Sequence, residues 1–410
     1  MRDCIPAVVD TDLLFTPLKL RNVTLRNRLL RSATYEGLGD PQGFPRAELG
    51  AVYTTLAQGG VGAIITGFVY VSQAGRAMQP GQCGMDADDK IAAWKQIVQQ
   101  VKRSDPEVRL FLQLAHAGRQ TRRAATGLPV AGVSARPCSY FRQRVHVLTD
   151  AEIETIIDEF GMAAARARQA GFDGVQIHGA HGYLVHQFLS PWTNNRSDRW
   201  ANRSLFLEET VRAVKRTCGP DYPVLVKLSA ADDNFPGIRI ENAIATVKRL
   251  EPLGVDAVEI SYGTMEYALN IIRGKCPVDL ALQVNPLFNR IPRLVRGLWK
   301  ALRAKAYLAR FIPFEENYNA VAAGRIKAAT SLPILAIGGF RSREGMLECM
   351  RGQGVDGISL SRPLICEPDW PRKLQRGAGG KSACCNCNSC TIQCDSRQSL
   401  RCYRRKKEPA

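Results

Sequence analysis

The chain has 410 residues, of which 45% are hydrophobic and 23% are charged, and these proportions exclude a predominantly disordered protein. It has no apolar run of about 18 residues, the length that a membrane-spanning helix needs, and residues 1–15 lack the apolar stretch of a signal peptide. The net charge of +18 is concentrated in residues 290–310 and 401–407. Six of the 13 cysteines crowd into residues 384–402, which favours a metal or cluster site over a disulfide framework, so we expect a cytoplasmic protein.

Eight short runs rich in Val, Ile and Leu alternate with longer stretches of helical pattern. Such runs are typical of strands that are buried on both faces, and eight strand–helix alternations favour a closed (β/α)₈ barrel over an open sheet. One helix is expected over 150–170, with Thr149 and Asp150 as candidate caps and Gly171 as its end. The barrel is assigned to residues 1–372 and a Cys-rich tail to 373–410. The predicted strands are 29–33, 61–66, 108–114, 172–178, 223–229, 255–261, 332–338 and 355–361.

Polar residues and glycines gather where these strands end, while the strand bodies stay apolar. Because active sites of such barrels lie at the carboxyl ends of the strands, the strand ends are the candidate site. Gly338, Gly339, Ser361 and Arg362 follow the seventh and eighth strands, where phosphate often binds; glycine allows close approach of backbone N–H groups, and arginine can pair with phosphate. The alternative is a plain turn after each strand.

His178 and His181 follow the fourth strand, and Tyr183 comes two residues later. Two histidines can bind a metal, but a third ligand is missing nearby, since no Asp or Glu follows until Asp198. The alternative is that they are core histidines with a structural role only. Their position beside glycines at a strand end favours a functional role over this alternative. We favour hydrogen-bond donors to a substrate oxygen, with Tyr183 as a general acid.

The stretch HGAHGYLVHQFLSPWTNNRSDRW at 178–200 resembles the signature of the old yellow enzyme family, in its NADH:flavin oxidoreductase branch, to which the barrel of 2,4-dienoyl-CoA reductase also belongs. The resemblance extends over about residues 13–372, with a gap at an insertion. Further similar segments are LFTPLKLRNVTLRNRLLRSAT at 14–34, FLQLAHAGRQ at 111–120, the strand that carries Lys227, IGGFRS at 337–342 and SLSRPLI at 359–365.

This resemblance implies non-covalent FMN, with NAD(P)H as the reductant and an unsaturated carbonyl compound or enoyl thioester as the substrate. It implies that His178 and His181 bind the carbonyl oxygen and that Tyr183 protonates the α carbon. Tyr35 departs from the family, whose members often have a small hydroxyl or thiol there, and Trp200-Ala-Asn202 replaces the usual Tyr-Gly-Gly. The implied FMN-binding residues are Ser32, Ala33 and Thr34 at the ring edge, Gly67 beside it, Gln113 at the pyrimidine, Lys227 near N1, and Gly338, Gly339, Ser361 and Arg362 at the phosphate.

The tail has the ferredoxin-like spacing C-x2-C-x2-C-x3-C at Cys384, Cys387, Cys390 and Cys394, although Asp395 replaces the usual proline. The resemblance to dienoyl-CoA reductases implies a [4Fe–4S] cluster on a C-x2-C-x3-C core with a distant fourth cysteine, a pattern that Cys387, Cys390, Cys394 and Cys402 could satisfy. A [4Fe–4S] cluster, a structural zinc ion and no metal at all stay open as interpretations.

An insertion of roughly residues 264–315 separates the sixth and seventh strands, and its core, 291–314, has no acidic residue. Helical spacing relates two sets of residues on opposite faces: apolar Leu294, Val295, Leu298, Trp299 and Leu302, and basic Arg293, Arg296, Lys300 and Arg303. The segment is interpreted as a lid helix packed over the barrel mouth, with contact to an anionic membrane or to an acidic substrate such as an acyl-CoA as the alternatives.

The sequence therefore predicts an FMN-dependent NAD(P)H:flavin oxidoreductase or ene reductase. One alternative is a cluster-containing flavin dehydrogenase, similar to an amine dehydrogenase, that passes electrons to a protein partner. A non-enzyme alternative is a redox sensor built on the cysteine tail. No nucleic-acid-binding motif accompanies the basic charge, so nucleic acid is not expected as a partner, and the oligomeric state stays open.

Overall fold

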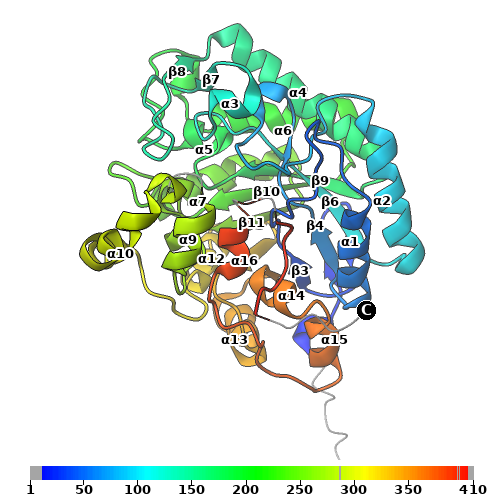
Figure 1. The fold of residues 1–410 in the computed structure, drawn as a ribbon. Helices are drawn as coiled ribbons and strands as arrows, with labels where there is room; N and C mark the ends of the chain where they lie inside the picture. Colours follow the sequence, from blue (N-terminus) through cyan, green and yellow to red (C-terminus); the bar gives the residue numbers. More distant parts are fainter. Residues whose placement is uncertain (1–11, 286–287, 395, 397, 405–410) are drawn as a thin grey trace, which may run out of the picture.

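The structure is a computed structural model, and it describes residues 12–285, 288–394, 396 and 398–404. Eight parallel strands of this part of the chain close into a barrel, which confirms the predicted fold (Figure 1). Each predicted strand overlaps one of them, and β6 and β9 end one residue later than predicted. In ring order they are β3 (Leu29–Arg31), β4 (Ala63–Ile65), β6 (Arg109–Ala115), β9 (Gly174–Gly179), β10 (Val224–Ser229), β11 (Ala257–Ser261), β12 (Ile334–Ile337) and β13 (Gly357–Leu360), which pairs with β3.

The inside of the barrel is filled by side chains, so that it is a packed core and not a pore. Apolar residues from six of the eight strands (β3, β4, β6, β10, β11 and β12) meet there, and the amino-terminal hairpin β1 (Leu18–Lys19) and β2 (Thr24–Leu25) adds leucines to the same cluster. The polar residues at the carboxyl ends of the strands are thereby separated from this apolar core. The buried members of the cluster are Leu18, Leu20, Leu25, Leu30, Ala63, Ile65, Phe111, Leu225, Ala257 and Leu335.

Helices surround the strands, and the predicted helix after Thr149 is confirmed at its start. The Thr149 hydroxyl accepts from the backbone N–H of Glu152, whose carboxylate accepts from the N–H of Thr149, which is a capping box. The surrounding helices are α1 (Glu48–Gln58), α2 (Lys90–Ser104), α4 (Asp150–Gln169), α6 (Leu205–Cys218), α7 (Ile240–Leu250), α12 (Ala320–Lys327), α13 (Arg343–Gln353) and α15 (Trp370–Gln375). Shorter elements are α3 (Arg123–Thr126), α5 (Leu184–Leu189), α14 (Arg362–Cys366), β5 (Val69–Tyr70), β7 (Val130–Gly132) and β8 (Val145–Val147).

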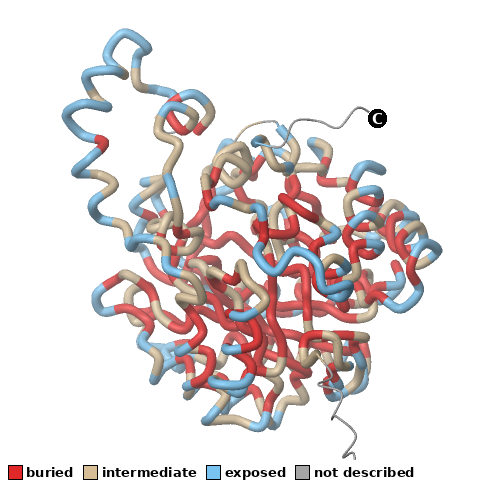
Figure 2. Tube along the Cα trace, turned by 90° about the horizontal axis from the view of Figure 1, so that it is seen from below, coloured by how far each residue is buried: buried red, intermediate tan, exposed pale blue. Residues whose placement is uncertain are grey.

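The insertion after β11 forms α8 (Ala268–Ile271) and α9 (Val278–Val284) and then a projecting helical segment. We call residues 288–311 the arm; its helical part comprises α10 (Arg296–Trp299), a π-helical turn (Lys300–Ala304) and α11 (Lys305–Leu308). The arm extends away from the barrel, and much of it is exposed (Figure 2). Leu294 is 99% and Leu302 67% exposed, so the predicted packing of this apolar face over the barrel mouth is wrong.

The tail packs on the barrel instead of forming a separate unit. Its helix α16 (Ser389–Gln393) contacts α9, and the Lys275 N–H donates to the Asn386 carbonyl. The Leu400 N–H donates to the carbonyl of Glu36, which follows the first barrel strand. Part of the predicted basic run at 401–407, and residues 1–11 with the predicted absence of a signal peptide, lie outside the described residues. Among the described helices, none has the length and apolar character needed to cross a membrane.

Candidate active site

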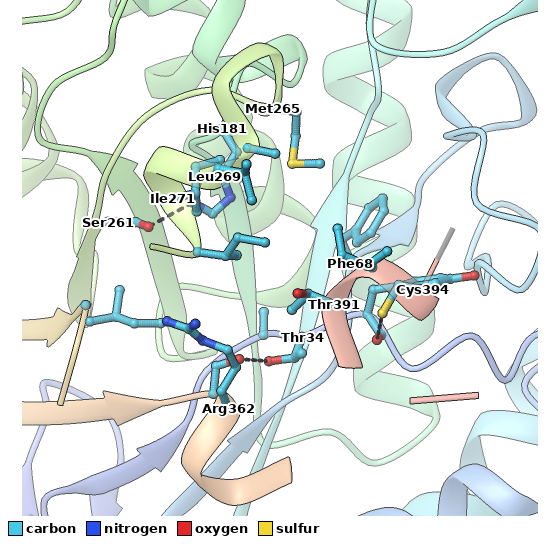
Figure 3. A pocket seen from close by; sticks show the side chains of 18 of the residues that line it. Thr34, Phe68, His181, Ser261, Met265, Leu269, Ile271, Arg362, Thr391 and Cys394 are labelled. Carbon is cyan, nitrogen blue, oxygen red and sulfur yellow. Dashed lines mark hydrogen bonds between the residues drawn. The ribbon is translucent and has the colours of Figure 1, made fainter. Parts of the chain in front are cut away.

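A cavity of about 320 Å³ opens at the carboxyl ends of the barrel strands, and the sequence-predicted residues converge there (Figure 3). Of the 13 predicted catalytic and flavin-binding residues, 11 line it; Ser32 and Gly67 do not, but Ser32 accepts a hydrogen bond from the lining residue Lys227. The residues that line the cavity are Ala33, Thr34, Gln113, His178, His181, Tyr183, Lys227, Gly338, Gly339, Ser361 and Arg362.

Ser32 and Lys227 belong to a buried polar network at the base of the cavity. The Lys227 ammonium lies 3.0 Å from the Glu259 carboxylate and donates to the Ser32 hydroxyl at 2.8 Å. Gln176 donates to Glu259 at 2.9 Å, and Gln113 donates to Gln176 at 2.7 Å. Burial opposes ionisation of Glu259, but the Lys227 charge and the hydrogen bonds outweigh burial and hold the pKa of Glu259 below its ordinary value. The network therefore fixes a lysine cation in the wall of the cavity.

Gly67 is held by a second buried group, the carboxylate of Glu36. The Gly67 N–H donates to Glu36 at 3.0 Å, and a Cβ at Gly67 would lie 2.2 Å from the same carboxylate. Arg31 pairs with Glu36 at 2.8 Å and donates to the carbonyl of Thr34 at 2.9 Å. This arrangement requires glycine at position 67, and it braces the ends of β3 and β4 beneath the cavity.

His178, His181 and Tyr183 meet at one end of the cavity, because the chain reverses after β9. His181 has φ +63° and Gly182 +80°, which turns both histidine rings to the same side, with centroids 5.1 Å apart. The rings of His178 and Tyr183 are 4.9 Å apart. His181 Nε2 hydrogen-bonds the Ser261 hydroxyl at 2.8 Å, which orients its ring. His178 Nδ1 is buried and has no hydrogen-bond partner among the described residues.

Both histidines are neutral at pH 7. Burial, followed by the charge of Lys227, holds the pKa of His178 well below its usual range, and burial and the neighbouring His178 do the same to the pKa of His181. A neutral imidazole has one N–H donor and no charge, so it binds anions more weakly than the charged Lys227 does. The pair is thus suited to donating hydrogen bonds to a neutral carbonyl oxygen.

Because the pKa values of these histidines are lowered, we expect the free energy of unfolding to depend on pH. Burial also lowers the pKa of His116 to about 3. Because the unfolded chain binds protons at these three positions below about pH 6.5 and the folded chain does not, the free energy of unfolding should fall by up to about 1.4 kcal/mol per pH unit for each histidine. Urea unfolding between pH 7 and 5 measures the slope. His116→Gln should reduce it by one histidine's share, and an unchanged slope would contradict burial of a neutral ring.

The opposite side of the cavity is formed by the turns after β12 and β13. Gly338 and Gly339 have φ of +139° and +84°, and a Cβ at either would lie 2.8 Å from Asn319, Tyr318 or the backbone at 315–317. The Thr34 and Ser361 hydroxyls are 2.9 Å apart. Arg362 is buried and donates to the Asn388 side chain at 2.6 Å, so the tail holds this guanidinium in place.

Segments outside the barrel strands complete the walls. Met265, Leu269 and Ile271 of the insertion lie near His181, and Thr391 and Cys394 of the tail lie near Phe68 (Figure 3). The arm contributes Phe288, Tyr307 and Phe311. Tyr35, the departure noted in the sequence, lines the cavity with its ring 5.8 Å from that of Phe68, and its hydroxyl accepts from the Gly81 N–H at 2.9 Å.

Comparison with known families agrees with this geometry. The model of the NADH:flavin oxidoreductase / NADH oxidase family matches residues 13–281, more than half of the chain.

The chain belongs to this family.

Similar curated proteins include the NADH oxidase of Thermoanaerobacter brockii, 30% identical over 386 residues (93% of this chain, 53% of that protein). Another is the NADPH dehydrogenase of Bacillus velezensis, 35% identical over 271 residues (64% of this chain, 77% of that protein). The chain spans about half the length of the first of these relatives. Its fold is similar to that of the old yellow enzyme homologue from Zymomonas mobilis, with a TM-score of 0.69 and 24% identity over 90% of this chain and 94% of that one. The fold of 2-naphthoyl-CoA reductase is also similar, with a TM-score of 0.78, 22% identity, and coverage of 94% of this chain and 56% of that one.

The residues of the cavity fit the FMN that this family implies. Besides His178 Nδ1, five buried polar atoms of cavity-lining residues have no partner within the described part of the chain: Gln79 Oε1, Gln120 Oε1, Ser359 Oγ, Arg341 Nε and Asn386 Nδ2. Buried polar groups are normally satisfied, so these atoms indicate a ligand that offers acceptors and donors. Lys227 and Arg362 supply cations for an anionic ring system and a phosphate.

The tail cysteines are divided between two cavities. Cys384, Cys387, Cys390 and Cys402 line a second cavity of about 290 Å³, whereas Cys394 lines the main one with its thiol 3.7 Å from the Tyr35 carbonyl. The Cys394 thiol is nevertheless 3.4 Å from the Cys390 carbonyl, so the two cavities meet at the short helix α16. Within the described residues, no group of three or more His, Cys, Asp or Glu side chains is placed to hold a metal ion, and no cysteine there forms a disulfide.

Sequence reasoning missed Gln176, Glu259, Glu36 and Arg31 as parts of the site. A signal existed for Glu259, since an acidic residue inside the apolar run VDAVEIS needs a buried partner. The arm aromatics were also missed, because their distance from the strand ends along the chain gives no hint of contact with the cavity.

Proposed function

We propose that this chain is an FMN-dependent ene reductase that oxidises NAD(P)H and reduces an alkene conjugated to a carbonyl group. Ser32, Ala33, Thr34, Gly67, Gln113 and Lys227 are assigned to the flavin ring, and Gly338, Gly339, Ser361 and Arg362 to its phosphate. The observation that carries the proposal is a pair of neutral imidazoles, His178 buried and His181 half-buried, beside the buried phenol of Tyr183 at one end of the cavity.

Bound FMN supplies hydride transfer between the nicotinamide and the alkene. His178 and His181 donate hydrogen bonds to the carbonyl oxygen, on which negative charge develops as the β carbon is reduced. Ser261 keeps the His181 ring in position for this contact. Tyr183 holds a proton at its Oη atom and transfers it to the α carbon, which completes the addition of two hydrogens across the double bond.

The substrate proposed is an enone or enoyl thioester with a large apolar or aromatic group. Support comes from the wall that the arm forms with Phe288, Tyr307 and Phe311, whose rings contact one another with centroids 5.3 to 5.6 Å apart. Phe311→Ala should raise KM for an aryl-substituted enone about 3- to 10-fold and leave KM for 2-cyclohexenone unchanged. Steady-state kinetics with both substrates checks this, and an equal rise for the two would show a general distortion of the site.

The proposed reaction is tested with the purified chain, FMN and a panel of enones and enoyl thioesters, each with NADH and with NADPH. Product analysis should show saturation of the carbon–carbon bond at an unchanged carbonyl. His178→Ala and His181→Ala should each lower the rate of alkene reduction, since each removes one donor to the oxygen. A panel in which no alkene is reduced, although NAD(P)H is oxidised, would overturn the ene-reductase assignment.

A second candidate is a flavin dehydrogenase that passes electrons through a [4Fe–4S] cluster to a protein partner. The observation that favours it is that Cys384, Cys387, Cys390 and Cys402 line one cavity, and that Arg362 lines both this cavity and the main one. Thiolates are the usual ligands of such clusters. Anaerobically purified protein should then contain about four iron and four sulfide per chain. Absence of iron and sulfide would remove this candidate and leave the ene reductase standing.

A further inference from the structure

The outer face of the arm is apolar and exposed. Leu294, Leu298 and Leu302 follow one another at one-turn spacing, and they are 99%, 62% and 67% exposed. Val295, 45% exposed, adjoins them. Exposed leucines in isolation are common, but a row of them on one projecting helix marks an interaction surface.

The inner face of the same helix is anchored to the protein. Lys300 donates to the carboxylate of Asp279 in α9 at 2.7 Å, and Ala304 is buried. Within the arm itself, the Tyr307 and Phe288 rings are 5.6 Å apart, and Arg296 donates to the carbonyl of Ile291 at 2.9 Å. The helix is therefore held to the protein through Lys300 and Ala304, while Leu294, Leu298 and Leu302 are exposed on an arm that projects from the barrel (Figure 2).

The charged residues of the segment that carries the leucines are all basic. Residues 291–314 contain six basic residues, Arg293, Arg296, Lys300, Arg303, Lys305 and Arg310, and no acidic one. Arg293, Arg303 and Lys305 are exposed, and among the described residues none of the three forms an ion pair. An acidic patch on a protein partner would pair with the basic side chains, but it would leave the continuous row of leucines without an apolar surface to pack against. An anionic lipid surface satisfies both, because it offers negative headgroups above an apolar layer.

We propose that the arm docks this protein on an anionic bilayer, with Leu294, Leu298 and Leu302 inserted at the boundary between headgroups and acyl chains and with Arg293, Arg303 and Lys305 at the headgroups. This peripheral contact is independent of the proposed reaction. The arm projects beyond the barrel, so its outer face can enter the headgroup layer while the barrel stays in water (Figures 1 and 2). Since the inner face of the arm lines the active-site cavity, docking also brings the cavity wall next to the lipid.

The test is flotation of the full chain with large unilamellar vesicles of phosphatidylcholine, with and without 30% phosphatidylglycerol. The wild-type chain should float with the anionic vesicles only, and less at high salt. Leu294→Ser/Leu298→Ser/Leu302→Ser should weaken binding at least about tenfold. Arg293→Gln/Arg303→Gln/Lys305→Gln should weaken it about fivefold per removed cation. Val321→Ser, which changes an apolar residue of α12 that is 63% exposed, is the matched control and should bind like wild type.

All changes are at exposed positions, and circular dichroism verifies that each variant is folded. Failure of the wild-type chain to float, or flotation that the leucine variant retains, would overturn the proposal. So would a dimer in analytical ultracentrifugation that the leucine variant abolishes while vesicles stay unbound, because a second copy of the chain would then cover the leucines.

Discussion

Tyr183→Phe is expected to slow reduction of the alkene by about 10²- to 10⁴-fold, because it removes the proton that the α carbon must receive. Tyr183 is buried, and its ring packs on those of His178 and Phe68 at 4.9 and 5.3 Å. Phenylalanine keeps this packing, so substrate and flavin should bind as before. Reduction of the flavin by NAD(P)H needs no proton from Tyr183 and should keep its rate.

Stopped-flow absorbance separates the two half-reactions of this variant. Tyr222→Phe is the matched control, since it removes another buried hydroxyl, which donates to the Phe172 carbonyl at 3.3 Å outside the cavity. It should leave both half-reactions unchanged. If Tyr183→Phe slowed flavin reduction as much as alkene reduction, Tyr183 would be part of the scaffold and not the acid.

Lys227→Met is expected to lower the free energy of unfolding at pH 7 by about 3–5 kcal/mol, since it leaves the buried Glu259 carboxylate without its cation. Lys227 and Glu259 are 2% and 0% exposed, so water cannot replace the lost partner. The variant should also purify with little flavin, because Lys227 lines the cavity. Urea unfolding and the absorbance of the purified protein measure the two effects.

The pH dependence identifies the cause of this loss. In the wild-type chain the pKa of Glu259 is lowered, so its contribution to stability is present above the unfolded value of about 4.3 and is lost as pH falls through the folded value. Without Lys227, burial raises that pKa, so the deficit should shrink as pH falls from 7 to 5. Lys227→Met/Glu259→Gln should recover much of the stability at pH 7. A deficit that the second change leaves untouched would contradict the ion-pair explanation.

The barrel and most of its site follow from the sequence, because both depend on local pattern. Apolar runs fixed the strands, and residues at the ends of parallel strands meet at one mouth, which is why His178 and Arg362 converge from distant segments. The partner of Lys227 was missed for a different reason. Glu259 reaches it only because β10 and β11 are neighbours in the register that pairs Lys227 with Glu259, and pairing is a property of the closed barrel.

The arm and the tail show what periodicity and spacing leave undetermined. Helical spacing grouped Leu294, Leu298 and Leu302 on one face, as observed, but it does not say what covers that face. Spacing likewise grouped Cys394 with Cys390. In the structure Cys394 lines the main cavity, whereas Cys390 and Cys402 line the second one. What covers the leucines of the arm, and which cavity each cysteine lines, depends on contacts between distant segments and not on local spacing.

The most direct test of the central claim is an anaerobic absorbance titration of the purified chain. It should carry a flavin spectrum, release FMN on denaturation, bleach with NADH or NADPH, and regain its colour when an enone is added. A colourless chain that neither releases nor binds FMN would contradict the assignment of the cavity. A bleached flavin that no enone reoxidises would contradict the roles given to His178, His181 and Tyr183.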